Sequence, residues 1–262
     1  MPAGNAHWQS MAKGWHRLGP PLRPSPEDVE HFRRALGDTP GDCLLLGVTP
    51  ELAGLSAHLT ALDNSADMIR ALCPQDRYAL LGDWLDMPFE DASFDHVIGD
   101  GCPVLLDHPL QHERLFAEAA RVLKPRGRLV MRVFVGAEQP ESPEQVCSLA
   151  LAEDIRGFHA FKWRLSMAIA AQSRDYTFGI ADTLHTFERL LPDRARLAAI
   201  TGWRMQDIAT IDFYRDSSAR YSYPPLSALR CIVPLALREV EVRYGSYELA
   251  ERCPILVWER RA

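Results

Sequence analysis

Four short apolar runs in the first hundred residues end in glycine or aspartate, at Gly47, Asp63, Asp83 and Asp100. If these runs are parallel β-strands, the four residues meet at the carboxyl-terminal edge of one sheet, where α/β proteins bind ligands. A carboxylate there can accept hydrogen bonds from ligand hydroxyl and amino groups. Glycine has no Cβ and lets a ligand come close to the backbone. The pattern therefore predicts a ligand site built from strand ends.

Helix signals lie between these runs, so that strands and helices alternate along the chain. Ser25 is a good N-cap, Pro26 suits the first helical position, and Gly37 follows the last apolar residue of that stretch. Strands separated by helices pair in parallel and predict a doubly wound α/β sheet. The expected strands cover residues 43–46, 59–62, 78–81, 94–98 and 128–135, and the expected helices cover 26–36, 65–72 and 110–123.

The C-terminal half has a different pattern. Apolar side chains recur every three to four residues over 144–171, which predicts one long amphipathic helix. Shorter helices are expected over 182–191 and 194–200. Alternating apolar residues over 239–244 and a β-rich run over 254–258 predict an antiparallel pair that completes a seven-stranded, mostly parallel sheet. The helices are expected to form a cap over the strand ends.

The composition and net charge of the chain reduce the number of possible functions further. The 262 residues carry 29 basic and 35 acidic side chains, a net charge of 29 − 35 = −6, which makes the chain a poor default binder of nucleic acid or anionic membranes. No apolar run is long enough to span a bilayer, and the first residues lack the apolar segment of a secretory signal. The six cysteines contain no CxxC pair. We expect a cytoplasmic protein with reduced thiols and no metal.

Three segments resemble the class I S-adenosylmethionine-dependent methyltransferases. LLGDWLDMPFEDASFDHVIGDGC (residues 80–102) is similar to the family's passage from strand 3 into strand 4, and ARVLKPRGRLVMRVF (120–134) resembles its turn into strand 5. LLLGVTPELAGLSAHLTALDNSADMI (44–69) stands where the family has its glycine-rich loop and ribose-binding acid. The resemblance implies a Rossmann-like fold, with S-adenosylmethionine as the methyl donor and S-adenosylhomocysteine as the product.

The glycine-rich loop departs from the family pattern. Gly47 matches the first glycine, but Leu45 replaces the preceding acid, and Thr49 and Glu51 stand at later glycine positions. Thr49 followed by Pro50 predicts a helix start. Its free N–H groups could receive the methionine carboxylate of the cofactor.

The resemblance also implies roles for individual residues. Asp63 is expected to accept both ribose hydroxyls, and Asp83 the adenine amino group, with Trp84 or Met87 packed on the base; the alternative for both acids is a turn or capping role. The segment Asp100-Gly101 should line the site of the transferable methyl. The full set expected at the cofactor is Arg23, Gly47, Val48, Thr49, Asp63, Asn64, Ser65, Met68, Gly82, Asp83, Trp84, Asp100 and Gly101.

Two residues of the N-terminal arm and two later ones complete the set of candidates. Arg23 could reach the methionine carboxylate from the arm, and Trp15 could close the pocket, although surface or core positions are the alternatives. The catalytic residue is unassigned, and His108 and Asp100 are the candidates for a general base. His108 and His112 have helical spacing, but no third metal ligand accompanies them.

Together these features predict a methyltransferase that acts on a small-molecule acceptor. Residues 1–37 would form an arm and helix over the cofactor, 38–137 the cofactor-binding core, and 138–262 the cap with the last strands. The base-modifying methyltransferase motif is absent after the fourth strand, where Asp100-Gly101-Cys102-Pro103 stands instead. One alternative is a catalytically inactive S-adenosylmethionine-binding accessory or regulatory protein. A nicotinamide oxidoreductase is the other, and the missing GxGxxG argues against it. The oligomeric state is left open.

Overall fold

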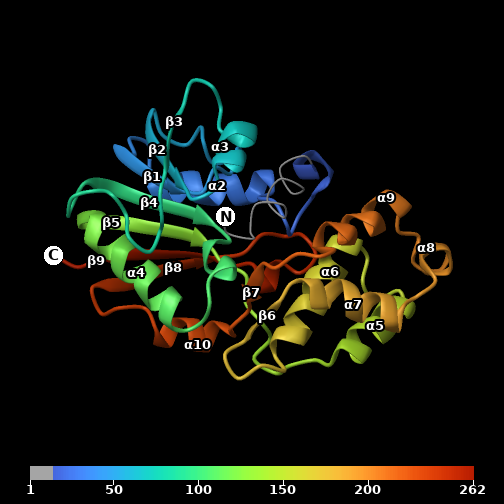
Figure 1. Cartoon of the computed structure of the whole chain (residues 1–262). Helices are drawn as coiled ribbons and strands as arrows, with labels where there is room; N and C mark the ends of the chain where they lie inside the picture. Colours follow the sequence, from blue (N-terminus) through green and yellow to red (C-terminus); the bar gives the residue numbers. More distant parts are fainter. Residues whose placement is uncertain (1–13) are drawn as a thin grey trace.

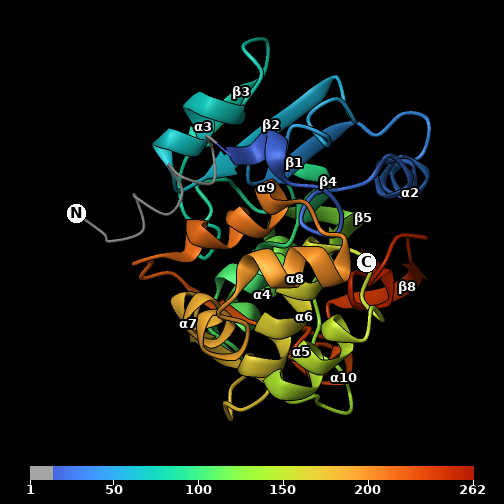
Figure 2. The same ribbon diagram turned by 90° about the vertical axis from the view of Figure 1, so that its right-hand side faces the viewer.

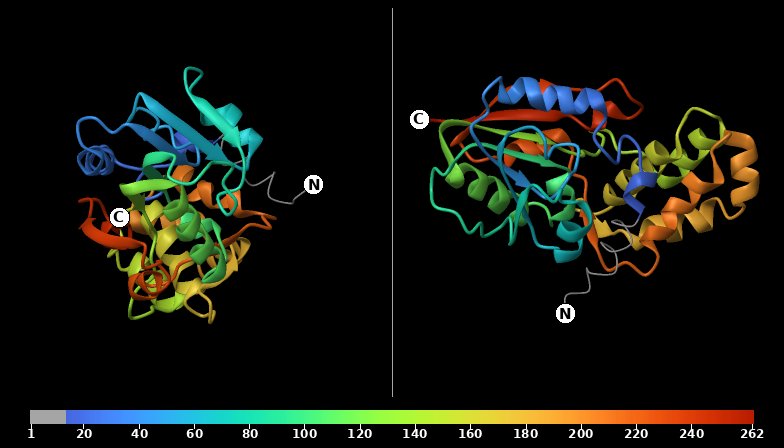
Figure 3. Two further views of the ribbon diagram at one scale, coloured as in Figure 1. Left: turned by 90° about the vertical axis from the view of Figure 1, so that its left-hand side faces the viewer. Right: turned by 90° about the horizontal axis from the view of Figure 1, so that it is seen from above.

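A β-sheet with its covering helices forms one half of the molecule, and a group of helices forms the other half (Figure 1). We describe this arrangement from a computed structural model, which describes residues 14–262. The helical half begins after the fifth strand and returns to the sheet before the last two, so it is an insertion in the sheet's sequence. Figure 2 looks onto the inserted helices, and Figure 3 shows the sheet from its opposite end and from above.

The sheet has seven strands in the order β3-β2-β1-β4-β5-β9-β8. The first five pair in parallel, and β9 runs antiparallel to both of its neighbours. This confirms the predicted doubly wound, mostly parallel sheet with a terminal antiparallel pair. The strands are β1 (Asp42–Leu46), β2 (His58–Asp63), β3 (Tyr78–Leu81), β4 (Phe94–Asp100), β5 (Leu123–Arg132), β8 (Leu237–Arg243) and β9 (Ile255–Arg260).

Helices cover both faces of the sheet. On one face, α2 (Pro26–Leu36) and α3 (Ala66–Leu72) pack on alternate strand residues such as Leu45 and Val130. The other face is covered by α4 (Leu110–Val122) and by α10 (Leu226–Cys231). Figure 3 shows α2 lying along the sheet.

The start of α2 has the predicted cap. The Ser25 hydroxyl accepts the backbone N–H of Asp28, and the Asp28 carboxylate accepts the backbone N–H of Ser25. This reciprocal pair satisfies two N–H groups that the helix start would otherwise leave without a partner.

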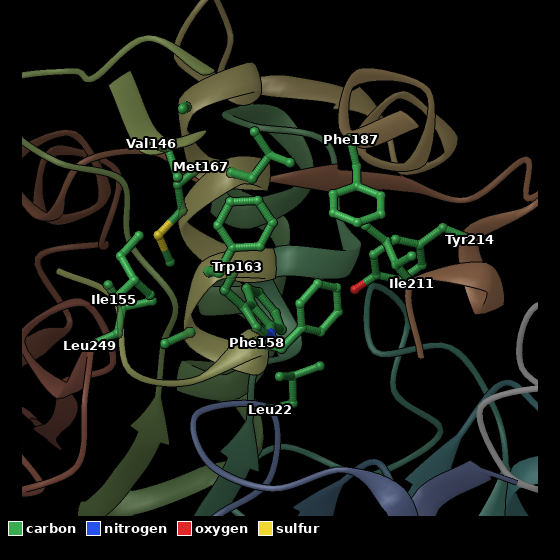
Figure 4. Close-up of a cluster of buried hydrophobic side chains, with 14 of the residues drawn as sticks. Leu22, Val146, Ile155, Phe158, Trp163, Met167, Phe187, Ile211, Tyr214 and Leu249 are labelled. Atoms are coloured by element: carbon green, nitrogen blue, oxygen red, sulfur yellow. The ribbon is translucent and has the colours of Figure 1, made fainter. Parts of the chain in front are cut away.

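The insertion has its own hydrophobic core. Phe158, Phe161, Phe187 and Trp203 pack edge-on or tilted, with ring centroids 5.2–6.1 Å apart. Figure 4 shows part of this core, including Phe158 and Phe187, with Leu22 of the N-terminal segment on its sheet side. The insertion consists of α5 (Pro143–Leu151), α6 (Phe158–Ala170), α7 (Ala181–Leu190), α8 (Arg194–Thr201), α9 (Met205–Ile208), the 3₁₀ helix Ala209–Tyr214, and a ribbon of β6 (Thr177–Gly179) and β7 (Arg220–Ser222).

The single long helix predicted over 144–171 was wrong, because the chain forms α5 and α6 instead. Glu153 has a positive φ of 62°, which ends the first helix. The Glu248 carboxylate then accepts the backbone N–H groups of Arg156 (2.6 Å) and Gly157 (2.8 Å) at the start of α6. The apolar period continues through the break, but a distant carboxylate stabilises a second helix start there.

The helix predicted to start at Thr49 and Pro50 was also wrong. The backbone makes two successive turns there, in which Leu52 N–H donates to Thr49 O and Ala53 N–H to Pro50 O. Both bonds join residues three apart, and β2 begins at His58, so the segment does not develop into an α-helix. A ligand carboxylate therefore finds no helix N-terminus at this loop. Within residues 14–262, no helix combines the length and apolar character needed to cross a membrane.

Candidate functional site

A cavity of about 200 Å³ lies where the strand ends meet the insertion. We call its polar side the strand-end half, which is lined by Gly47, Val48, Thr49, Asp63, Asn64, Met68, Asp83 and Trp84. We call the other side the aromatic half, which is lined by Trp15, Leu22, Val104, Leu105, Leu106, Phe134, Trp163 and Tyr221. Asp100 and Gly101, at the end of β4, lie between the two halves.

Asp63 is the last residue of β2 and lines the strand-end half. Its Oδ1 accepts the backbone N–H of Ser65 at 2.7 Å, which leaves Oδ2 for a ligand. The side chain is buried, and burial raises its pKa to about 6, although the Ser65 hydrogen bond opposes the shift. A buried carboxylate with a free oxygen suits a ligand that donates from hydroxyl groups, because the ligand then supplies the hydrogen bonds that burial removed.

Gly47 and Trp84 form the adjoining wall. Gly47 has a φ of 90°, and its N–H donates to Leu62 O at 2.8 Å. Trp84 donates from Nε1 to the same carbonyl at 2.6 Å, which fixes its ring beside the glycine. A Cβ built on Gly47 would lie 3.7 Å from that ring and 3.8 Å from Asp63 Oδ2. The positive φ strains any other residue here, and the missing side chain leaves this corner open to a ligand.

Three further predicted residues line the strand-end half. Asp83 is exposed and its Oδ1 accepts the backbone N–H of Leu85 at 2.9 Å, whereas its other oxygen accepts no hydrogen bond from residues 14–262. Asn64 is exposed, and Met68 is buried on α3. An apolar surface beside exposed polar groups fits a flat heterocycle with hydrogen-bonding edges.

Asp100 is engaged by Arg132, a buried arginine at the end of β5. Arg132 Nε donates to Asp100 Oδ1 at 2.5 Å, and Nη2 donates to Oδ2 at 3.1 Å. Nη1 reaches Asp28 Oδ2, Tyr247 Oη and Arg23 O at 3.1–3.3 Å. Burial raises the pKa of Asp100, and the charge of the Arg132 guanidinium opposes this shift. Burial alone would lower the pKa of Arg132, but Asp100 and Tyr247 raise it above its usual range.

The pairing with Arg132 affects whether Asp100 can act as a general base. Both Asp100 oxygens accept from Arg132, so the carboxylate is held as the partner of a fixed cation. Gly101 follows with a φ of 69°, and its N–H donates to Arg132 O at 2.8 Å. Asp100 and Gly101 therefore serve as a rigid junction between the two halves.

Aromatic side chains continue the cavity wall from Gly101 into the insertion. A Cβ at Gly101 would collide with the Phe134 ring, so the two are in close contact. The Phe134 and Trp163 rings lie 4.4 Å apart, and Tyr221 lies 6.4 Å from Trp163. These three side chains come from the segment after β5, from α6 and from β7. The insertion thus supplies the wall that faces the strand ends.

Arg23, one of the predicted cofactor residues, does not line the cavity. It pairs with Glu51, donating from Nε at 2.7 Å and also from Nη2. Nη1 donates to the Trp15 carbonyl at 3.1 Å, and the guanidinium lies 5.5 Å from the Trp15 ring. Arg23 therefore positions Trp15, which does line the cavity, and its charge is compensated by Glu51.

Ser65, Gly82 and His108 also lie outside the cavity lining. The Ser65 hydroxyl caps α3 by accepting Met68 N–H, and Gly82 N–H donates to Asp63 O at 3.0 Å. The His108 ring packs 5.2 Å from that of His112 and 5.7 Å from that of Tyr176. Burial lowers the pKa of His108. None of these three contacts the space between the two halves.

Sequence reasoning missed most of the aromatic half. Trp15, a predicted candidate for closing the pocket, does line the cavity, and so does Tyr221. Nothing in the local pattern of Phe134 or Trp163 separates a cavity wall from ordinary core. The other missed lining residues are Leu22, Leu46, Leu72, Val104, Leu105 and Leu106.

Comparison with known proteins agrees with this geometry. Residues 43–131 match the family described as a methyltransferase domain. A demethylmenaquinone methyltransferase of Corynebacterium urealyticum is 38% identical over 109 residues, which are 39% of this chain and 46% of that protein. The match thus spans about half the length of this curated relative.

Two solved structures share the fold over nearly the whole chain. A Thermotoga maritima protein described as an S-adenosylmethionine-dependent methyltransferase is 14% identical with a TM-score of 0.55, covering 97% of this chain and 99% of its own. A Rhodobacter sphaeroides protein described as a candidate Zn-dependent alcohol dehydrogenase is 15% identical with a TM-score of 0.62, and the match covers 99% of this chain and 98% of that protein. At such identities the likeness shows the fold alone. Residues 43–131 therefore form a methyltransferase domain, and the strand order of the sheet agrees with a Rossmann-like fold.

Proposed function

We propose that this protein transfers a methyl group from S-adenosylmethionine to a small-molecule acceptor held in the aromatic half. One observation carries the proposal: a single cavity joins polar strand-end groups to the aromatic wall of the insertion. A two-substrate transfer needs two adjoining sites of different chemistry. Residues 38–137 would bind the donor, and residues 138–262 would enclose the acceptor. Of the predicted arm and helix over 1–37, residues 1–13 lie outside the described part of the chain, and Trp15 and Leu22 line the aromatic half instead of the donor side.

The strand-end half fits the adenosine part of the donor. Asp63 Oδ2 would accept the ribose hydroxyls, and Asp83 would accept from the adenine amino group. Trp84 and Met68 would contact the base, and Gly47 would allow a close backbone approach. When bound, S-adenosylmethionine supplies a methyl group on a positively charged sulfur, which is already activated for displacement.

The chain's own contribution is then mainly positioning. Phe134, whose ring contacts Gly101, and Trp163 beside it would hold the acceptor and would exclude water there. Proximity and orientation can supply roughly 7–11 kcal/mol of such a barrier. No side chain is assigned as a general base, because Asp100 is paired with Arg132 and His108 lies outside the cavity lining.

A small acceptor fits the enclosure by the insertion, and the curated relatives are named for a small molecule, demethylmenaquinone. The alternative is an accessory protein that binds the donor without transferring its methyl group. Both would bind S-adenosylhomocysteine, and only the enzyme would turn over labelled donor with a suitable acceptor.

Thermal unfolding with S-adenosylhomocysteine, S-adenosylmethionine and NADH in separate samples tests the donor site. Ligand at about 100 times its dissociation constant adds ~2.7 kcal/mol. We expect Tm to rise by roughly 5–11 °C with the two adenosyl ligands and to stay constant with NADH. A rise with NADH alone would contradict the proposal. Transfer of labelled methyl groups then separates the enzyme from the accessory protein.

A further inference from the structure

The cavity is smaller than the molecules proposed to occupy it. Its volume of about 200 Å³ lies below the roughly 300–1,000 Å³ of pockets that enclose one drug-sized ligand. S-adenosylmethionine alone is a ligand of that size, and the acceptor has to fit beside it. The walls of the cavity therefore have to separate when these molecules enter and when the product leaves.

One of these walls includes a short segment at the start of the described chain, residues 15–23, which we call the strap. Figure 1 shows the strap, in blue, between the sheet and the insertion. Leu18 and Leu22 are buried in the hydrophobic core of the insertion, and Arg17 Cζ lies 5.7 Å from the centroid of the Phe213 ring. Trp15 and Leu22 line the cavity. The strap is therefore packed with the insertion and extends its aromatic wall.

The strap meets the loop after β1 through an ion pair. Residues 47–49 of that loop line the strand-end half. The Arg23 guanidinium donates to Glu51 Oε1 from Nε at 2.7 Å and also from Nη2. Within residues 14–262, the hydrogen bonds that join the strap to residues 47–57 all belong to this pair. The Arg23–Glu51 pair thus connects one wall of the cavity to the other.

The surroundings of the pair suit a contact that breaks and forms again. The Arg23 and Glu51 side chains are 25% and 17% exposed, so water can solvate both charges when they separate. The pairs of Arg132 are buried, and separating them would leave unsolvated charges. Arg23 Nη1 also donates to the Trp15 carbonyl at 3.1 Å. The guanidinium therefore keeps a partner in the strap when Glu51 is released.

We propose that the Arg23–Glu51 pair is a latch, which holds the cavity closed and breaks when the methyl donor enters and when S-adenosylhomocysteine leaves. This inference rests on the proposed function, and it adds a control of ligand exchange. Neither side chain lines the cavity, so the pair stabilises the closed form equally with and without ligand. Breaking the pair should therefore change the rates of exchange and leave the affinity unchanged.

Stopped-flow fluorescence of S-adenosylhomocysteine binding tests the latch, because Trp15 and Trp84 line the cavity and can report its occupancy. Glu51→Gln keeps the size of the side chain and removes its charge. We expect the association and dissociation rate constants both to rise roughly threefold to thirtyfold, because the closed form loses a charge-assisted, partly exposed contact. Kd should stay within about a factor of two of the wild-type value.

Salt gives a second readout, which a purely structural role of Glu51 would not change. S-adenosylhomocysteine has one carboxylate and one ammonium and no net charge near neutral pH, so salt acts mainly on the protein. At an ionic strength of about 1 M the Debye length falls to about 3 Å, which weakens a partly exposed pair. Exchange should become faster with salt in the wild type and stay constant in Glu51→Gln.

Glu30→Gln is the matched control, because Glu30 pairs with Arg33 and Arg34 on the exposed side of α2. It should keep the wild-type rate constants and their dependence on salt. Arg23→Gln breaks the latch from the other side and should also accelerate exchange. Circular dichroism verifies that each variant folds.

Unchanged rate constants in both Glu51→Gln and Arg23→Gln would overturn the inference. A higher Kd with an unchanged association rate constant would also overturn it, because Glu51 would then contact the ligand itself. Either result would leave the proposed function standing. Absence of S-adenosylhomocysteine binding to the wild type would instead contradict the proposed function.

Discussion

The two halves of the cavity are built in different ways. In the strand-end half, Gly47, Asp63 and Asp83 lie at or just after the ends of three adjacent parallel strands, so the sheet places them side by side. In the aromatic half, Trp15, Phe134, Trp163 and Tyr221 come from segments far apart in the sequence and meet through packing of the insertion. The comparison shows that the half we assign to the donor depends on local topology, whereas the acceptor half depends on tertiary contacts.

Arg132 lies where the halves meet. It connects Asp100 of β4 with Asp28 of α2 and the Arg23 carbonyl, and its guanidinium contacts the Phe134 ring. Removing the Arg132 guanidinium should therefore lower the free energy of unfolding more than substitutions within either half.

The largest effect is expected for Arg132→Met. Removing the guanidinium leaves the Asp28 and Asp100 side chains, 0% and 4% exposed, without their cation. Breaking a buried ion pair from one side destabilises by about 3–5 kcal/mol. Urea unfolding measures the loss. Arg238→Met is the control, since its pair with Glu259 is exposed and contributes about 0–1 kcal/mol. Equal losses for both variants would contradict the role of the junction.

In the strand-end half, Asp63→Asn should stabilise the ligand-free protein. Burial raises the Asp63 pKa to about 6, so the folded protein holds this proton more tightly than the unfolded chain does. Ionisation of Asp63 therefore destabilises the fold as pH rises from about 4 to about 6, by about 2–3 kcal/mol in full. At pH 7.5 the variant's Tm should exceed that of the wild type by roughly 4–10 °C, with little difference at pH 4. A lower Tm at pH 7.5 would show that the carboxylate is not strained by burial.

In the insertion, Lys162 gives a smaller and opposite pH dependence. It is fully buried against Thr210 and the Tyr214 ring, and burial lowers its pKa to about 7. The unfolded chain binds this proton more tightly, so stability should rise with pH above 7. His159 nearby has its pKa lowered to about 4 and does not titrate in this range.

Urea unfolding of wild type and Lys162→Met at pH 7 and pH 9 measures this effect. The wild type should gain roughly 2 kcal/mol relative to the variant between these values. Parallel pH profiles would show that Lys162 is neutral throughout or is paired more strongly than the structure indicates.

How well the structure can be predicted from the sequence depends on the same difference between local and distant contacts. The helix start at Ser25 and Pro26 and the strand-end position of Asp63 depend on neighbours in the sequence, and the structure has them as predicted. The break between α5 and α6 depends on Glu248, more than ninety residues away, and periodicity alone does not contain that information.

Site residues show the same limit. Arg23 was predicted to face the cofactor, but Glu51 binds its guanidinium, and that pairing depends on the arm's path over the loop after β1. Trp163 has the same helical period as the core residues around it. Its place in the cavity wall becomes visible only once the insertion is packed against Phe134.

Calorimetric titration of S-adenosylhomocysteine into wild type, Asp63→Ala and Trp163→Phe tests the division of the cavity most directly. Asp63→Ala removes a charged acceptor from the ribose site and should raise Kd by a factor of roughly 5 to 150. Trp163→Phe should leave Kd unchanged, because its side chain belongs to the aromatic half. An unchanged Kd in Asp63→Ala, or a large loss in Trp163→Phe alone, would contradict the assignment of the two halves.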